Sequence, residues 1–554
     1  MRRALSILLS LIILATACTR DVHAGPDQAR GPSCDPTIDA AIRNWEAAGF
    51  SGSVAFLGGD RDCVAAYGQA DPAAGRAMTT DTVFSIGSIT KAVVAAAIGS
   101  LEADGRLTYD QPVGDLVPGL IGPIGETTVE QLLLHTGGVT GNHGRDLEPL
   151  DRDRALAALA GLDRAAAPGS EFLYSNAGYT ALALVIDELT GDYRTYLTDR
   201  ILTDGATNIG GFWNGEPAAA GPRAVGTTST GQPGADGSFG GPHWGLDGSG
   251  GVAMTAEQLA NWTMRLFAGD ILAPDALERL LSLRFDQGYG SVEVPGWVSL
   301  DGAVFGEPVF GTAGGGSDIG HTMTVAWLPE SGRVYSIATN SAEADAEAVL
   351  ADLLPDLVAG RSPTGPAVAD GGLNPVVAEA VTGRWTVADG ARVEVFQDGD
   401  AVVVQAIDPA AVPMVLPVPD PEAAAAHEAA VLNVVAGSTE EGRRERALLE
   451  DSFGPIEAIE VFGTWFADIE YRTYLSIRFA AEEVLVWLAV DGRGGIAAAE
   501  VGTPPPSRSF IQRPDGWLAP IDPASEAVDL RIRFVDMGLE IVNGSAIELA
   551  ERVG

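Results

Sequence analysis

Lysine is almost absent from this chain. Among its 34 lysine and arginine residues, Lys91 is the only lysine. An arginine keeps its proton in a protein, whereas a lysine amine gives its proton up when burial or neighbouring cations lower its pKa. A chain that uses arginine at every other basic position therefore has reason to keep a lysine where a site needs an amine base.

Positive charge is scarce altogether. The 554 residues include 75 Asp and Glu, and the formal net charge is −41. No run of basic residues is present that could neutralise phosphates, so we expect no nucleic-acid partner. The acidic residues are spread along the chain, which is typical of a solvated surface that keeps a secreted protein soluble.

The apolar run at the N-terminus, residues 4–14, is too short to span a bilayer. Two arginines precede it and small residues follow it, which predicts a signal peptide over 1–17. The letters LATAC resemble the lipobox of bacterial lipoproteins. This resemblance implies a lipid-modified Cys18, a tether over 18–33, and a protein anchored to the outer face of the bacterial cell membrane. The alternative is an ordinary signal peptide with an incidental cysteine.

Cysteine and histidine are few. The six His and three Cys form no cluster with carboxylates at ligand spacing, so we expect neither a metal nor another cofactor. With Cys18 lipidated, Cys34 and Cys63 allow a single pairing, and an oxidising compartment favours a disulfide between them. Two free buried thiols are the alternative.

The pattern of apolar and polar residues predicts a mixed α/β (α+β) domain over residues 34–356. Amphipathic periods alternate there with short strands and Gly-rich loops. The expected helices are 36–48, 151–161 and 255–268, and the expected strands include 52–59 and 334–340. The loop 203–250 is long and rich in Gly, Pro and Trp, as the walls of binding clefts commonly are.

A change of composition marks a second part of the chain. The Pro- and Gly-rich stretch 357–376 predicts a linker, and 377–554 predicts a β-rich domain. Within it, 392–407 is expected to form a hairpin and 422–452 an inserted helical piece. Further strands are expected at 471–479, 483–490 and 530–544.

Ser88 and Lys91 form a Ser-x-x-Lys motif. If Ser88 opens the apolar helix that follows, the two side chains lie one turn apart on the same face of the helix. The helix is apolar enough to be buried, and burial favours the neutral amine. A serine hydroxyl needs such a base to become a nucleophile, and a helix N-terminus stabilises negative charge that develops beside it.

Tyr174 and Asn176 form a second motif, Tyr-x-Asn, in front of another apolar helix. Tyr174 can relay protons, and Asn176 can hydrogen-bond a substrate carbonyl or the lysine. A core tyrosine followed by a helix-capping asparagine is the alternative interpretation.

Together these motifs resemble the serine β-lactamase-related family, which includes class C β-lactamases, DD-peptidases and esterases of the same fold. The likeness covers nearly all of residues 40–350. It also rests on the segments VFSIGSITKAVVAAAIGSLEADGRLTYDQPVGDLVP, ETTVEQLLLHTGGVTG and DGSGGVAMTAEQLANW. It implies a β-lactamase/transpeptidase-like domain with an antiparallel sheet flanked by helices. A C-terminal β-rich domain also occurs in relatives, and a lipocalin-like barrel is one form for it.

The resemblance implies acyl transfer. Ser88, deprotonated by Lys91 with help from Tyr174, attacks a carbonyl carbon and forms an acyl-enzyme that water then hydrolyses. The oxyanion hole is expected to comprise the backbone N–H groups of Ser88 and Ser317. Asn176 is expected to bind the substrate.

The third motif of the family, Lys-Thr-Gly or His-x-Gly, is changed in this chain. The matching residues are Gly314, Gly315 and Gly316, and a shifted alignment over 312–314 also lacks a cation. Gly314 and Gly316 are expected to line the substrate site. In the family the cation helps to bind a substrate carboxylate, so its replacement favours a neutral ester or amide. His321 either compensates by binding substrate or is a hydrogen-bonded strand histidine.

We therefore expect an exported serine hydrolase that acts on an ester, an amide or a peptide. The alternative is a catalytically silent relative that binds a peptide or a cell-wall fragment. Nothing in the sequence supports an α/β-hydrolase, because no Gly-x-Ser-x-Gly elbow is present.

Overall fold

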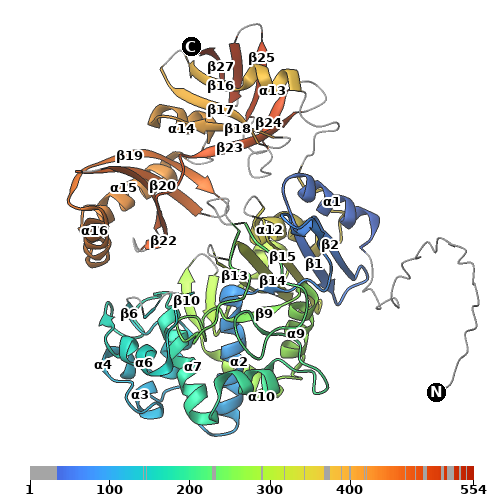
Figure 1. Ribbon diagram of the computed structural model, residues 1–554, viewed down its shortest axis with the longest axis vertical. Helices are drawn as coiled ribbons and strands as arrows, with labels where there is room; N and C mark the ends of the chain where they lie inside the picture. Colours follow the sequence, from blue (N-terminus) through green and yellow to red (C-terminus); the bar gives the residue numbers. More distant parts are fainter. Residues whose placement is uncertain are drawn as a thin grey trace, which may run out of the picture.

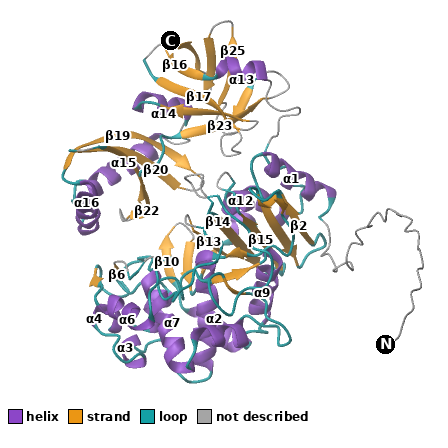
Figure 2. Ribbon diagram, in the orientation of Figure 1, coloured by secondary structure: helices purple, strands orange, loops and turns teal. Residues whose placement is uncertain are grey.

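Residues 34–553 are described by the computed structural model in Figure 1, apart from short stretches. Those stretches are 141–142, 145, 228–232, 289–290, 317–318, 342–343, 367–374, 388–389, 399–400, 417, 419–420, 468–469, 481, 491–495, 513–516, 521–529, 536–537 and 544–545. Helices and strands are mixed in the first part of the chain and strands dominate the last part, as Figure 2 shows. This arrangement confirms the predicted α/β (α+β) class.

The first part of the chain is built on an antiparallel sheet with the strand order β10-β11-β12-β13-β14-β15-β1-β2. The strands are β1 (Gly52–Leu57), β2 (Cys63–Tyr67), β10 (Phe285–Gly288), β11 (Ser291–Val294), β12 (Trp297–Leu300), β13 (Val309–Gly316), β14 (His321–Leu328) and β15 (Arg333–Thr339). Gly52 of β1 lies opposite Thr339 of β15, so the two ends of this part meet in the sheet.

Helices cover both faces of this sheet. On one face, α1 (Pro36–Ala47) and α12 (Ala346–Val358) pack in one apolar cluster with Val54. The next side chain on β1, Ala55, points the other way because side chains alternate along a strand. It belongs to the larger core that contains α9 (Ala256–Ala268).

Two helices of the larger core, α2 (Thr90–Ala103) and α7 (Asn176–Thr190), lie in contact with each other. Both are apolar on nearly all sides, as expected of helices inside a core. Ser175 caps α7 by accepting the N–H of Gly178, and Gly191 ends it with a φ of 91°. The remaining helices of this part are α3 (Val113–Leu116), α4 (Gly122–Gly125), α5 (Val129–Leu133), α6 (Arg152–Ala160), α8 (Tyr193–Tyr196), α10 (Pro274–Ser282) and α11 (Gly302–Phe305).

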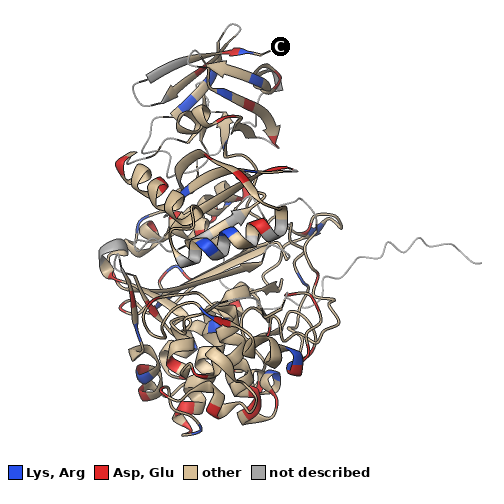
Figure 3. Cartoon of the chain, turned by 90° about the vertical axis from the view of Figure 1, so that its left-hand side faces the viewer, with Lys and Arg blue, Asp and Glu red and all other residues tan. Residues whose placement is uncertain are grey.

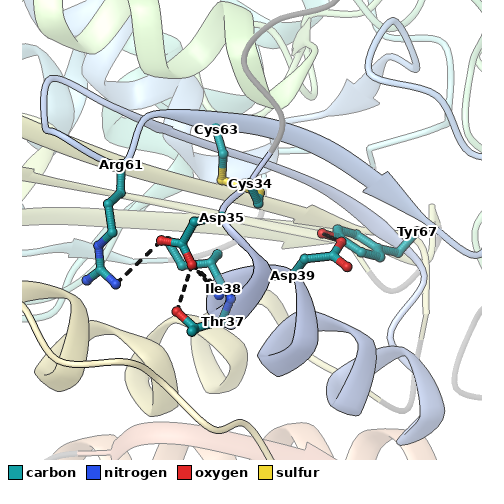
Figure 4. Close-up of a disulfide and its surroundings, with 8 residues drawn as sticks. All are labelled: Cys34, Asp35, Thr37, Ile38, Asp39, Arg61, Cys63 and Tyr67. Atoms are coloured by element: carbon teal, nitrogen blue, oxygen red, sulfur yellow. Dashed lines mark hydrogen bonds and ion pairs between the residues drawn. A yellow bond between two sulfur atoms is a disulfide. The ribbon is translucent and has the colours of Figure 1, made fainter.

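A disulfide ties the start of the first part together. It joins Cys34, at the N-terminus of α1, to Cys63 at the start of β2. Figure 4 shows Asp35 next to it, where the carboxylate accepts the backbone N–H groups of Thr37 and Ile38 and caps α1. The structure therefore pairs the two cysteines that the sequence leaves for a bridge.

The second part of the chain contains a closed barrel. Its strands, in order around the barrel, are β16 (Gly383–Val387), β17 (Arg392–Asp398), β18 (Ala401–Ala406), β23 (Ser507–Gln512), β24 (Leu518–Pro520), β25 (Leu530–Val535), β26 (Gly538–Asn543) and β27 (Ala546–Arg552). Pairing of β16 with β27 closes it, and apolar side chains such as Trp385 and Phe510 form its core. The barrel confirms the predicted β-rich domain, and β17 with β18 confirms the predicted hairpin.

An insertion between β18 and β23 forms a separate sheet covered by helices. It comprises α14 (Val412–Val415), α15 (Pro421–Val435), α16 (Glu440–Phe453), β19 (Ile456–Ala467), β20 (Glu470–Phe479), β21 (Glu483–Val490) and β22 (Ile496–Val501). The predicted helical piece 422–452 is confirmed, as two helices with a break at Gly437. The stretch 530–544, expected to be a strand, forms the two strands of the hairpin β25–β26.

The predicted signal peptide 1–17, the lipidation site Cys18 and the tether 18–33 lie outside the described residues. In the described part of the chain, no helix is both long and apolar enough to cross a membrane. At the predicted linker 357–376, α12 extends to Val358 and the next helix, α13 (Pro375–Val381), begins at Pro375.

Charged side chains are dispersed over the fold. On the side shown in Figure 3, basic and acidic residues are interspersed over helices, strands and loops. The large acidic excess of the sequence is therefore distributed in small groups on this side of the molecule, as a solvated surface requires.

Candidate active site

Ser88 lies in a tight turn, Gly87–Ile89, that leads directly into α2. Gly87 has a φ of 50°, and a Cβ there would lie 2.6 Å from the backbone nitrogen of Gly315. Only glycine fits a left-handed position that strand β13 approaches this closely. The turn is thereby held against the end of β13, with the Ser88 side chain half-buried.

Lys91 lies one turn further along α2, and its side chain reaches back to Ser88. The Lys91 amine nitrogen Nζ is 3.0 Å from Ser88 Oγ and 2.9 Å from the carbonyl oxygen of Ser249. The residue is only 3% exposed. Burial lowers the pKa of Lys91 to about 7, although Asp146 and Glu293 oppose this shift with their negative charges.

Tyr174 approaches Ser88 from the other side. Its hydroxyl donates to Ser88 Oγ over 2.7 Å, and Lys91 Nζ lies 4.8 Å from the centre of its ring. The residue is 54% exposed, and its hydroxyl end contacts Ser88 Oγ. Desolvation of the phenol raises the pKa of Tyr174 to about 12, so the phenol is neutral at neutral pH.

The carbonyl of Ser249, which accepts from Lys91, lies two residues after a buried ion pair. Asp247 is 4% exposed, and both of its oxygens accept hydrogen bonds from the guanidinium of Arg194. The same guanidinium also donates to the carbonyl of Asn214. Arg194 thus ties Asp247, near the end of the predicted cleft loop 203–250, to Asn214 of the same loop. The carbonyl of Ser249, two residues after Asp247, is the main-chain acceptor for the Lys91 amine.

Glu293 is a second buried acid near the site. It is 6% exposed on β11, and its carboxylate accepts a hydrogen bond of 2.9 Å from Gln287. The β11–β12 turn lies against α2, since a Cβ on Gly296 would come within 2.4 Å of the Ala92 Cα. Burial raises the pKa of Glu293 to about 8, while its interaction with Lys91 lowers it.

Strand β13, which carries the third motif, lies too close to Ser88 to allow a side chain at Gly314. A Cβ at Gly314 would lie 2.3 Å from the carbonyl oxygen of Ile86 and 2.4 Å from the backbone nitrogen of Ser88. The family's cation therefore has no room at this position. Gly316 ends β13, and Ser317, the expected second oxyanion donor, lies outside the described residues.

His321 lies inside the protein, away from the open side of the site. It is 1% exposed, and its Nδ1 accepts the backbone N–H of Ser85 over 3.3 Å. Its ring meets the rings of Phe84 and Trp213 edge-on, and burial lowers its pKa to about 3. This placement favours the hydrogen-bonded strand histidine over a substrate ligand.

Asn176, the other predicted substrate-binding residue, lies at the first position of α7. Its side chain is exposed and makes no hydrogen bond with any residue that the structure describes. The structure does not join it to Lys91, whose amine contacts Ser88 and Ser249 instead.

The sequence motifs thus meet in space around one hydroxyl. Ser88 Oγ lies between an amine whose pKa is lowered and a phenol whose pKa is raised. Sequence reasoning missed Ser249 and Glu293. Ser249 stands in the DGSGG segment quoted for the resemblance, which is the one signal that could have directed attention to it.

Comparison with known proteins identifies a family to which this part of the chain is similar. The Beta-lactamase family model matches residues 38–359, more than half of the chain. The chain is similar to esterase EstB of Burkholderia gladioli, with 32% identity over 33% of this chain and 52% of that protein. It is also similar to penicillin-binding protein 4 of Amycolatopsis lactamdurans, with 32% identity over 23% of this chain and 36% of that protein.

These matches span about half of the esterase and about a third of the penicillin-binding protein. Among solved structures, the octameric penicillin-binding protein homologue from Pyrococcus abyssi is similar over 92% of this chain and 98% of its own, with a TM-score of 0.54. At 18% sequence identity, this likeness shows a shared fold that extends over the barrel part.

Proposed function

The chain belongs to the beta-lactamase family, and on that premise we propose that it is a serine hydrolase acting by acyl transfer on an ester, an amide or a peptide. One observation carries the proposal. Ser88 Oγ is in hydrogen-bond contact with the Lys91 amine at 3.0 Å and with the Tyr174 hydroxyl at 2.7 Å. A hydroxyl held between a base and a proton relay is the arrangement that nucleophilic catalysis by serine requires.

Lys91 is the better candidate for the base. With a pKa of about 7, a large share of its amine is neutral at neutral pH and has a free lone pair. Tyr174, with a pKa of about 12, is a phenolate in only about one molecule in a hundred thousand at pH 7. We therefore assign proton abstraction to Lys91 and proton relay to the neutral Tyr174 phenol.

The reaction then follows from these roles. As Ser88 Oγ bonds to the carbonyl carbon, its proton passes to Lys91 Nζ, and the carbonyl oxygen takes up negative charge. The N–H of Ser88, at the start of α2, is the expected donor to this oxygen. Collapse breaks the bond to the leaving group, which receives a proton through Tyr174. Water then attacks the acyl carbon and gives a proton to Lys91; the bond from this carbon to Ser88 Oγ breaks, the acyl group leaves as a carboxylic acid, and the proton returns from Lys91 to Ser88 Oγ.

The third-motif position favours an uncharged substrate. A cation at Gly314 would overlap the Ser88 turn, so the partner that the family offers to a substrate carboxylate is missing there. A carboxylate that loses its hydration without gaining a cationic partner is costly to bind. We therefore rank a neutral ester or amide above a D-alanyl peptide, and that peptide above a β-lactam.

Covalent labelling tests the proposal. The purified protein is incubated with a fluorophosphonate, which is neutral around its reactive phosphorus, and separately with a labelled penicillin, which carries a carboxylate. Mass spectrometry then locates any adduct, with Ser88→Ala as the control. We expect a fluorophosphonate adduct at Ser88 and much slower labelling by penicillin. No adduct at Ser88 with either reagent would favour the catalytically silent alternative.

We also propose that the protein is exported and anchored by a lipid on Cys18. The lipobox-like LATAC supports this, as does the disulfide between Cys34 and Cys63, because oxidising compartments maintain such bonds. In cells fed radiolabelled palmitate, we expect label in the wild-type protein and none in Cys18→Ala. Equal labelling of both would contradict the anchor.

A further inference from the structure

Tyr174 lies in an irregular segment just before α7, so no helix or strand of its own fixes its position. The proposed function, on which this inference rests, nevertheless requires the hydroxyl to stay at Ser88. Something outside the segment must therefore hold the ring in place. The structure points to His135, which comes from the end of the α5 segment.

His135 contacts the main chain on both sides of Tyr174. Its carbonyl oxygen accepts the N–H of Leu173 over 2.7 Å, and its ring nitrogen Nδ1 accepts the N–H of Ser175 over 3.0 Å. Leu173 and Ser175 are the two neighbours of Tyr174. One residue therefore binds the backbone immediately before and immediately after the tyrosine.

The ring of His135 also supports the ring of Tyr174. The two rings are stacked, with 4.4 Å between their centres and 29° between their planes. Such contacts between ring systems restrict the side-chain torsions of both residues. Tyr174 stays 54% exposed while His135 is buried, so the histidine supports the tyrosine from the protein interior and leaves it accessible to substrate.

His135 is itself firmly placed. It is 3% exposed, and its ring also contacts the rings of Phe172 and Tyr179. Its φ of 55° is the one positive value among the described residues other than glycine. A side chain kept in this unfavourable backbone region is often one that a site requires. Burial also keeps its pKa well below the ordinary value, so the ring is neutral and Nδ1 is free to accept.

We propose that His135 is a positioning residue for Tyr174, which it holds by two main-chain hydrogen bonds and a ring stack so that the phenol oxygen stays at Ser88. The histidine touches none of the reacting atoms and acts through the tyrosine. Its loss would let the ring turn outward into water.

The test uses His135→Ala, which removes the stack and the Nδ1 acceptor, and His135→Asn as the matched control. Asparagine tolerates a positive φ, and its side-chain oxygen can accept the N–H of Ser175. Comparable thermal midpoints of all variants are required, so that any effect belongs to the site.

The first measurement does not depend on turnover. The protein is labelled with [ζ-13C]tyrosine, and the Tyr174 signal among the ten tyrosines is assigned with Tyr174→Phe. We expect the phenol to titrate near pH 12 in the wild type and in His135→Asn, and closer to 10 in His135→Ala, where the ring enters water. An unchanged titration in His135→Ala would overturn the proposal.

The second measurement is the rate of fluorophosphonate labelling at Ser88. We expect His135→Ala to slow it about a hundredfold, the usual cost of misplacing a catalytic group by about 1 Å. The double variant with Tyr174→Phe should be no slower than Tyr174→Phe alone, because both changes remove the same function. A double variant slowed by the product of the two single factors would contradict the proposal. Absence of any wild-type adduct would refute the proposed function, and the tyrosine titration would still decide the role of His135.

Discussion

Lys91 is the residue on which the proposed chemistry depends. It is buried, its amine contacts Ser88 Oγ, and its pKa is lowered to about 7. An arginine in its place would remain charged at any pH that the protein tolerates. This difference accounts for a lysine in a chain that otherwise uses arginine.

Replacing Lys91 by methionine removes the amine and keeps most of the side-chain volume. We expect labelling and turnover at Ser88 to fall by about 10²- to 10⁴-fold, the contribution of a general base. The free energy of unfolding should change by only about 1 kcal/mol, because one buried hydrogen-bonded amine is lost. The control is Arg106→Met, which removes an exposed cation just beyond the same helix. Comparing the two variants distinguishes the loss of the base from a general effect of removing a positive charge. Wild-type rates in Lys91→Met would show that another group takes the proton.

The charge of Glu293 affects how tightly the Lys91 amine holds its proton. When ionised, its charge raises the pKa of Lys91, so replacing it by glutamine lowers that pKa. Since the neutral amine is the active form, labelling of the wild type should decline as the pH falls through about 7. Glu293 has a pKa of about 8 and is therefore ionised in only a small share of the molecules near pH 7, so in Glu293→Gln this decline should occur at slightly lower pH. A profile that moves to higher pH would mean that the charge of Glu293 does not raise the pKa of the amine.

The sequence predicted Ser88, Lys91 and Tyr174 as site residues and missed Ser249 and Glu293. Ser88, Lys91 and Tyr174 belong to motifs with recognisable spacing. Ser249 contributes a main-chain carbonyl, which every residue possesses, so its identity carries no signal. Glu293 is one of 75 acids, and only the folded sheet shows that it is buried beside Lys91.

Among the elements, β13 and the Ser88 turn depend on each other most closely. A Cβ at Gly314 would overlap the backbone of this turn, at 2.3 Å from Ile86 O and 2.4 Å from Ser88 N. Gly311, on the same strand, has no atom within 4 Å of a Cβ placed there, and provides the matched control.

We expect Gly314→Ala to lower the free energy of unfolding by about 1–3 kcal/mol, the usual cost of overpacking, and to abolish Ser88 labelling because the turn must move. Gly311→Ala should behave like the wild type in both respects. Chemical denaturation and labelling rates measure the two effects. Wild-type stability and rate in Gly314→Ala would mean that the strand can move aside freely.

Element boundaries show what composition alone misses. The helical stretch 422–452 breaks where Gly437 takes a φ of 74° and Thr439 caps the next helix by accepting the N–H of Gly442. Both signals stand in the sequence as Gly-Ser-Thr, whereas the overall richness in Ala and Glu hides them. The sequence shows that glycines replace the cation of the third motif. Only the folded structure shows the steric reason, which is the close approach of β13 to the Ser88 turn.

At the scale of the whole molecule, the chain has separate cores. The described apolar clusters of the first part share no member with those of the barrel. Phe462 and Trp465, by contrast, pack against both the barrel core and the aromatic cluster of the inserted sheet. We therefore expect the barrel and the insertion to unfold together and the first part to unfold separately.

Scanning calorimetry should accordingly show at least two transitions. Reducing the Cys34–Cys63 bond, which closes a loop of 29 residues, should destabilise only the part that carries Ser88, by about 3 kcal/mol. The Cys34→Ser/Cys63→Ser double variant should reproduce this shift without reductant. A single transition that moves as a whole would show that the cores unfold as one unit.

The scarcity of lysine provides the most direct measurement of all. Because Lys91 is the only lysine, protein labelled with [ε-13C]lysine gives one lysine signal, whose chemical shift reports the protonation of this amine. The account predicts a single titration with a midpoint near pH 7. A signal that stays protonated up to the ordinary lysine pKa of about 10.4 would contradict it, because the amine beside Ser88 would then hold its proton throughout the physiological range.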